Sequence, residues 1–116
     1  MNVVIIEGTL SRAPEERTLA SGASLLVCEV TVRDEGQPTE TVPVAWFEPP
    51  SSASRLVEGT PVTVSGRVRR RFFRAGGATV SRTEVVATTV VPSRGRARRA
   101  RVLDRARGEL DPADRV

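Results

Sequence analysis

The chain has 116 residues, a hydrophobic content of 39% and a formal net charge of +4 at pH 7. This length suits one small domain, and the composition is too apolar for a disordered chain. No stretch approaches the roughly 20 apolar residues of a membrane helix, and the N-terminus lacks the pattern of a signal peptide. One cysteine, Cys28, permits no internal disulfide. We therefore expect a cytoplasmic protein without membrane contact.

The positive charge is unevenly distributed. All 18 basic residues are arginine, with ten arginines and ten acidic residues in 1–91 and eight arginines and four acidic residues in 92–116. A guanidinium group binds phosphate through two donors and stacks on flat groups. We predict a folded domain over residues 1–91 and a flexible, arginine-rich tail over 92–116, which either contacts nucleic acid or is simply solvated.

Five segments have the apolar or alternating pattern of β-strands. The clearest alternation puts Leu26, Cys28 and Val30 on one face. Residues 11–21 are rich in turn formers and carry no strand signal. The expected strands are residues 3–6, 24–33, 41–47, 61–73 and 79–91.

A short helix is expected over residues 51–57, with a serine cap at its start and Gly59 after its end. An all-β chain of five strands, with a short helix between the third and fourth, has the order of an OB-fold. This fold is a five-stranded antiparallel Greek-key barrel, whose closure removes exposed strand edges. An open sandwich is the alternative, but sandwiches usually use about seven strands or more.

The sequence offers no equipment for catalysis. It contains no histidine, and its one cysteine cannot build a zinc site. No glycine-rich phosphate loop precedes a helix. We therefore expect no enzymatic activity, no metal and no cofactor.

The fourth predicted strand carries a candidate nucleic-acid-binding face. Alternation puts three guanidinium groups and then an aromatic ring opposite the apolar Val62 and Val64. Bases stack on rings while cations bind the phosphates, and each stacked base is worth about 1–3 kcal/mol. The residues of this face are Arg67, Arg69, Arg71 and Phe73.

Trp46 is the second candidate ring. It shares a face of the third strand with Val42 and Val44, and we predict that it stacks on bases, with burial in the core as the alternative. Arg33 and Arg74 lie at strand ends and are candidate phosphate ligands.

The other two rings are expected to be structural. Phe72 continues the valine face of its strand and is predicted to lie in the core. Phe47 is predicted to lie in the core or in an interface, and Cys28 to be a small buried hydrophobe.

The chain resembles bacterial single-stranded-DNA-binding proteins in four colinear segments within residues 1–91. They are NVVIIEGTL at 2–10, VAW at 44–46, GTPVTVSGRVR at 59–69 and TEVV at 83–86. The resemblance implies an OB-fold that assembles as a homotetramer or dimer and wraps single-stranded DNA during replication, recombination and repair. It places Trp46 and Phe73 where the family has stacking aromatics.

Several positions depart from the family pattern. Glu40 stands where the family usually has a further aromatic, and Val3 and Thr9 stand where it usually has basic residues. The acidic, hydrophobic C-terminal tip that recruits repair enzymes is absent from the sequence. We expect weaker binding than in a typical member, an accessory role, and no recruitment through such a tip.

The leading hypothesis is therefore sequence-tolerant binding of single-stranded DNA by a homo-oligomer, in which residues 3–6 pair with their copy. One alternative is an assembly subunit with weak or no DNA binding, since a fold does not determine function. Another is RNA binding, because stacking surfaces do not by themselves separate RNA from DNA.

Overall fold

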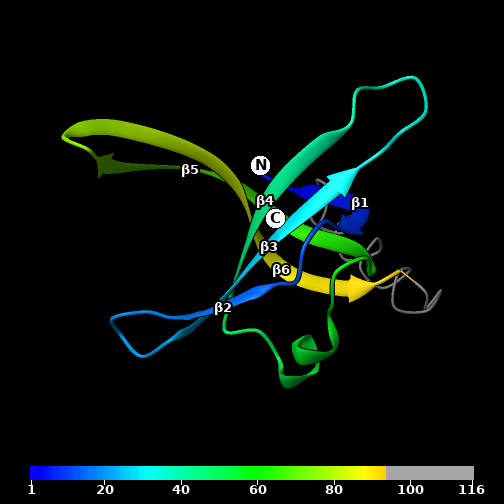
Figure 1. The fold of residues 1–116 in the computed structure, drawn as a ribbon, viewed down its shortest axis with the longest axis horizontal. Helices are drawn as coiled ribbons and strands as arrows, with labels where there is room; N and C mark the ends of the chain where they lie inside the picture. Colours follow the sequence, from blue (N-terminus) through cyan, green and yellow to red (C-terminus); the bar gives the residue numbers. More distant parts are fainter. Residues whose placement is uncertain (94–116) are drawn as a thin grey trace, which may run out of the picture.

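The computed structural model describes residues 1–93, which form six β-strands and one short 3-10 helix (Figure 1). The strands are β1 (Val4–Leu10), β2 (Glu15–Thr18), β3 (Ser24–Val32), β4 (Glu40–Phe47), β5 (Pro61–Ala75) and β6 (Ala78–Pro92). The helix η1 spans Ser51–Arg55. Nearly all of the predicted tail lies outside the described residues, so the domain boundary stays a prediction.

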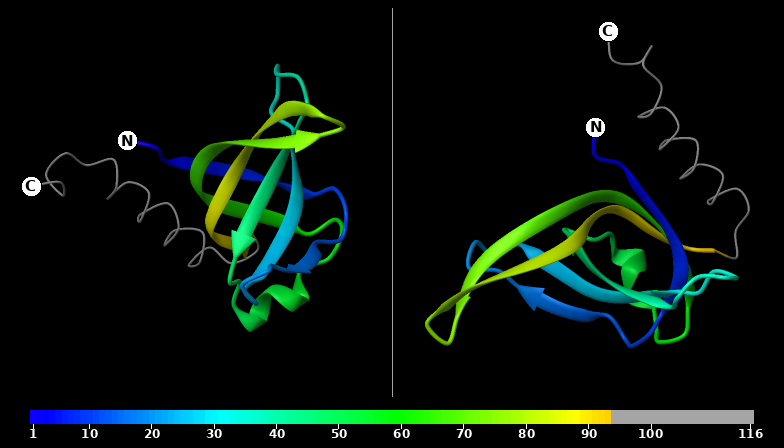
Figure 2. Two further views of the ribbon diagram at one scale, coloured as in Figure 1. Left: turned by 90° about the vertical axis from the view of Figure 1, so that its left-hand side faces the viewer. Right: turned by 90° about the horizontal axis from the view of Figure 1, so that it is seen from above.

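Five of the strands close into a barrel (Figure 2). The sheet order is β1-β5-β6-β4-β3-β2, and a pairing of β1 with β3 at Thr9 and Leu10 completes the ring. The pairs are antiparallel except β4 and β6, which run parallel at Val44↔Val85 and Ala45↔Val86. The prediction of an all-β OB-fold with a short helix between the strands now labelled β4 and β5 is confirmed.

The strand β2 is absent from the sequence-based prediction. It lies within the turn-rich segment 11–21 and pairs with β3 outside the ring. All four of its residues are exposed, so it has no apolar face to reveal it. The helix start also differs from expectation, because Pro50 occupies the N-cap and no side chain caps the helix.

The core fills the inside of the barrel and draws mainly on β3, β4, β5 and β6. The alternation predicted for β3 is confirmed, since Leu26, Cys28 and Val30 are all buried. Burial raises the pKa of the Cys28 thiol to about 11, which keeps it protonated and unreactive at neutral pH. Cys28 is thus a core residue, as expected.

The strands β5 and β6 cross very closely at Gly66. A β-bulge lies between Ser65 and Gly66, and a Cβ atom at Gly66 would collide with the carbonyl oxygen of Val86. Beyond this point the two strands leave the barrel as a long, mostly exposed hairpin (Figure 1). The Asn2 side chain donates to the carbonyl of Val68 at 2.7 Å and accepts from its N–H at 2.8 Å, at the base of the hairpin.

We predict that Gly66→Ala lowers the free energy of unfolding by about 1–3 kcal/mol, because the added methyl group must push two backbones apart. Urea unfolding followed by tryptophan fluorescence measures the change. The control is Thr79→Ala on the exposed hairpin, which should change stability by less than about 0.5 kcal/mol. Equal stability of the two variants would show that β5 and β6 can move apart at Gly66 without a loss of stability.

Candidate functional site

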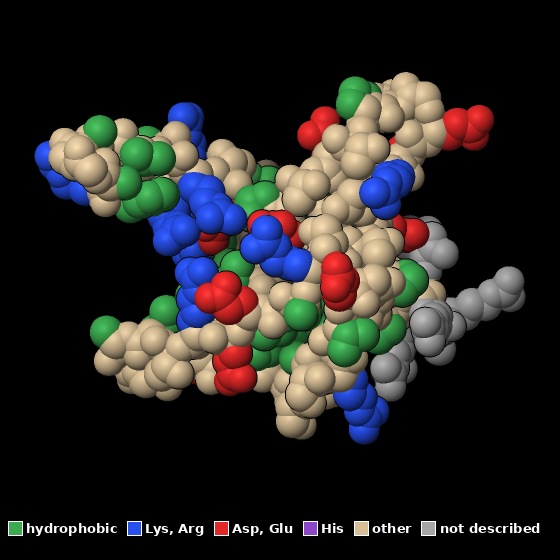
Figure 3. Space-filling view, viewed as in Figure 1, with side chains coloured by type: hydrophobic (Ala, Val, Ile, Leu, Met, Phe, Trp, Pro, Cys, Tyr) green, Lys and Arg blue, Asp and Glu red, His purple; other side chains and the backbone are tan. Residues whose placement is uncertain are grey.

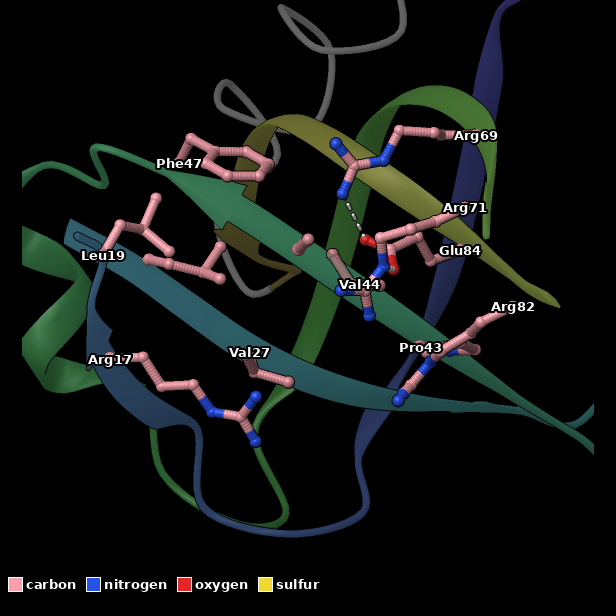
Figure 4. A pocket seen from close by; sticks show the side chains of 12 residues that line it. Arg17, Leu19, Val27, Pro43, Val44, Phe47, Arg69, Arg71, Arg82 and Glu84 are labelled. Atoms are coloured by element: carbon pink, nitrogen blue, oxygen red, sulfur yellow. Dashed lines mark hydrogen bonds and ion pairs between the residues drawn. The ribbon is translucent and has the colours of Figure 1, made fainter. Parts of the chain in front are cut away.

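A groove lies on the outer surface of β3 and β4, between the β5–β6 hairpin and β2 (Figure 4). Basic side chains gather between the hairpin and the barrel (Figure 3). The lining residues are Arg17, Leu19, Leu25, Val27, Pro43, Val44, Ala45, Phe47, Arg69, Arg71, Arg82 and Glu84. Four arginines and one glutamate thus line the groove together with apolar side chains, and two of the arginines contact the glutamate.

Strand alternation decides which rings reach the groove. Leu26 pairs with Trp46 on the core side of the sheet, and the next pair, Leu25 with Phe47, faces the groove. Trp46 is 5% exposed, whereas Phe47 is 36% exposed. The ring that β4 offers to the groove is therefore Phe47.

Glu84 organises one wall of the groove. Its carboxylate is 6% exposed and accepts a hydrogen bond from Nη2 of Arg69 at 2.9 Å. It also lies 3.2 Å from Nε of Arg71. One buried carboxylate thus holds two guanidinium groups, one through each of its oxygens (Figure 4 marks the Arg69 contact).

Each of these two guanidinium groups also lies over a ring. The Cζ of Arg69 is 5.4 Å from the centre of the Phe47 ring, and that of Arg71 is 5.3 Å from the Phe73 ring. These are cation–π distances. The order ring, guanidinium, carboxylate, guanidinium, ring forms one connected row, which we call the Glu84 row: Phe47, Arg69, Glu84, Arg71 and Phe73.

The remaining two arginines of the groove come from β6 and β2. Arg82 pairs with Arg71 across the hairpin, so two like charges share one face of the ribbon. Arg17 approaches from β2 and makes an exposed ion pair with Glu15 at 3.1 Å. This hydrogen-bonded pair lowers the pKa of the Glu15 carboxyl group and raises that of Arg17. The lining residues carry a surplus of positive charge.

Three of the predicted site residues meet in the row. Arg69 and Arg71 line the groove, and Phe73 lies beside Arg71 with 38% of its surface exposed. Arg67 is exposed on the same face of β5 but does not line the groove.

Other expectations differ from the structure. Trp46 is part of the core cluster, so its ring is not available to stack on a base in this conformation. Phe72, expected in the core, is 64% exposed because the hairpin has left the barrel by that point. Arg74 and Arg33, in contrast, are exposed at strand ends as expected, and Arg74 donates to the carbonyl of Gly77 at the hairpin turn. Their role as phosphate ligands stays a prediction.

Sequence reasoning missed the four other groove residues that carry a charge or an aromatic ring. Phe47 follows from alternation, since Val44 and Trp46 share the apolar face and leave Phe47 on the other. Arg82 and Glu84 follow once the hairpin register is known. Arg17 had no sequence signal, because its strand has no apolar face.

Within residues 1–93, no group of three or more potential metal-binding side chains lies together. The groove and the hairpin beside it present guanidinium groups, the rings of Phe47 and Phe73, and Glu84. Such a surface attracts anions and offers flat faces for stacking.

We predict that Glu84→Gln lowers the free energy of unfolding by about 1–3 kcal/mol, because two guanidinium groups lose a charged acceptor. Urea unfolding tests this, with the exposed Glu40→Gln as the matched control of equal charge change. Equal stabilities for the two variants would contradict a structural role for the Glu84 ion pairs.

One comparison with known proteins identifies a family. A family model described as "Single-strand binding protein family" matches residues 1–93, which is the whole described part of the chain. A search of curated proteins found no match.

Proposed function

The chain belongs to the single-strand binding protein family, and from this we propose that it binds single-stranded DNA in the groove, by base stacking and arginine–phosphate contacts. The observation that carries the proposal is the Glu84 row, which presents two supported rings beside an arginine-rich surface. Binding through ring faces and phosphates is tolerant of sequence, because every base has a flat face.

The two rings of the row suit stacking. Phe47 and Phe73 each have a guanidinium group against the ring and keep more than a third of their surface exposed. A ring that is already held loses less conformational freedom when a base stacks on it. We assign the stacking role to Phe47 and Phe73.

The arginines supply the phosphate contacts. Arg82 and Arg17 line the groove, and Arg67 extends the basic surface along β5. Arg69 and Arg71 already share the charge of Glu84, so together with it they act as a single positive charge. On single strands each phosphate neutralised adds about 0.7 to the log–log salt slope. Affinity should therefore fall steeply with salt.

The cellular role that we propose is protection or handling of single-stranded DNA during replication, recombination or repair, at the nucleoid. The proposal involves no catalytic step, in keeping with a family of DNA-binding proteins. In the described part of the chain, no helix is long and apolar enough to cross a membrane.

We also propose that the protein is a homo-oligomer that assembles through β1. This strand pairs with β5 along one edge from Val4 to Thr9 but with β3 only at Thr9 and Leu10. Along the first half of β1, no strand among the described residues pairs with the edge opposite β5. An unpaired edge is a template for pairing with a second copy about a two-fold axis.

We predict that Phe47→Ala and Phe73→Ala each weaken binding of a thymidine oligonucleotide by about 5- to 150-fold, the equivalent of one lost stacked base at about 1–3 kcal/mol. Fluorescence anisotropy of a labelled oligonucleotide measures the affinity. Val57→Ala, an exposed apolar residue outside the groove, is the control. Undiminished affinity in both ring variants would place the binding surface elsewhere.

We predict that Ile5→Asp reduces the oligomer to a smaller species in light scattering. Val4 and Ile6 pack against the core, so an aspartate there would mainly test folding, whereas Ile5 lies on the opposite face of β1. Val57→Asp places the same charge on an exposed apolar site away from β1. An unchanged mass for Ile5→Asp would show that β1 is not the interface.

A further inference from the structure

The β5–β6 hairpin has a second face that the groove does not use. Cross-strand partners share a face, so Phe73 and Val80 lie on the groove side, and Phe72 and Ser81 lie on the other. We call this other side the Phe72 face. Its residues are Arg70, Phe72 and Arg74 on β5 and Thr79, Ser81 and Thr83 on β6.

The Phe72 face repeats the chemistry of the groove. The Cζ of Arg70 is 5.4 Å from the centre of the Phe72 ring, which matches the pairing of Arg71 with Phe73 on the groove side. Nη2 of Arg70 also donates to Oγ of Ser81 at 3.1 Å, so the guanidinium group is held from both strands. Phe72 is 64% exposed, the most exposed of the three phenylalanines.

The charge of this face selects its partner. The sequence between Glu58 and Glu84 contains no acidic residue, and Glu84 points to the groove side. Among residues 1–93, the ion pairs of the structure include neither Arg70 nor Arg74. A second copy of the chain docked there would bring like charges together, whereas a chain of phosphates carrying flat bases complements both the arginines and the ring.

The edge of β5 connects the two faces. Pairing of β1 with β5 stops at Gly66, and the Asn2 side chain covers Val68. From Arg69 onward, no described strand pairs with this edge of β5. Because Phe72 and Phe73 are adjacent, their rings stand on opposite sides of this open edge.

We propose that the Phe72 face is a second contact site for the same single strand of DNA, which leaves the groove, passes over the open edge of β5 and stacks a base on Phe72. Arg70 and Arg74 bind the phosphates on either side of that base. This inference rests on the proposed function, since the strand must first occupy the groove.

The test compares affinities for thymidine oligonucleotides of increasing length, using anisotropy. Phe73→Ala should weaken binding at every length, because Phe73 lies on the groove side of the hairpin, beside Arg71. Phe72→Ala should match the wild type on the shortest oligonucleotide that fills the groove. On longer ones it should bind about 5- to 150-fold more weakly. Exposed substitutions of this kind seldom disturb folding.

A second variant places a fluorescent side chain at the proposed site, so that DNA binding there can be measured directly. Phe72→Trp keeps a flat ring, so it should retain wild-type affinity on long oligonucleotides. Its exposed indole should be quenched by long oligonucleotides and not by the shortest ones, over the steady signal of buried Trp46.

Several outcomes overturn the proposal. If Phe72→Ala binds oligonucleotides of every length as tightly as the wild type while Phe73→Ala binds them more weakly, the second site is excluded and binding in the groove is retained. A lower mass of Phe72→Ala in light scattering without DNA makes the face an interface between copies. Failure of the wild type to bind any length removes both the groove and this site.

Discussion

The groove depends on the buried carboxylate of Glu84. A carboxylate with 6% exposure is stable only when it is paired, and here two guanidinium groups pair with it. Arg69 and Arg71 share one face of β5 by alternation, the pairing joins both to the same carboxylate, and each of them lies over a phenylalanine ring. Without Glu84, Arg69 and Arg71 would lose the charged acceptor that they share and would keep only their ring contacts. The same carboxylate reduces the groove's positive charge. It therefore lowers the attraction for phosphates while it holds Arg69 and Arg71 in place.

Much of the fold could be predicted from the sequence, because most strands bury one face. Leu26, Cys28 and Val30 of β3 are buried, whereas Leu25, Val27 and Glu29, which alternate with them, are only partly buried. The sequence-based predictions are wrong where a strand does not cover the core. The strand β2 exposes every residue, and Phe72 continues an apolar pattern into a hairpin that has left the barrel. A period of two shows which residues share a face, but not where the barrel beneath that face ends.

The candidate site was only partly visible in the sequence. Arg69, Arg71 and Phe73 were identified correctly as one face of a strand, and the structure places them in one row. The choice of Trp46 over Phe47 rested on its place on one face of the predicted strand and on a family position, although that face also carries Val44, which lies in the core. The partners of the arginines depend on the hairpin register and on a strand with no sequence signal, so only the structure reveals them.

The most direct test of the account is an equilibrium titration of the unmodified protein with a labelled thymidine oligonucleotide over a series of salt concentrations. Unlabelled duplex DNA of equal length and a single-stranded RNA serve as competitors. The account predicts saturable binding at low salt, a log–log slope of about 0.7 for each phosphate contacted, and weak competition by duplex. If RNA competes as strongly as single-stranded DNA of the same length, the groove binds RNA as well as DNA. No saturable binding at low salt, or equal competition by duplex, would contradict the account.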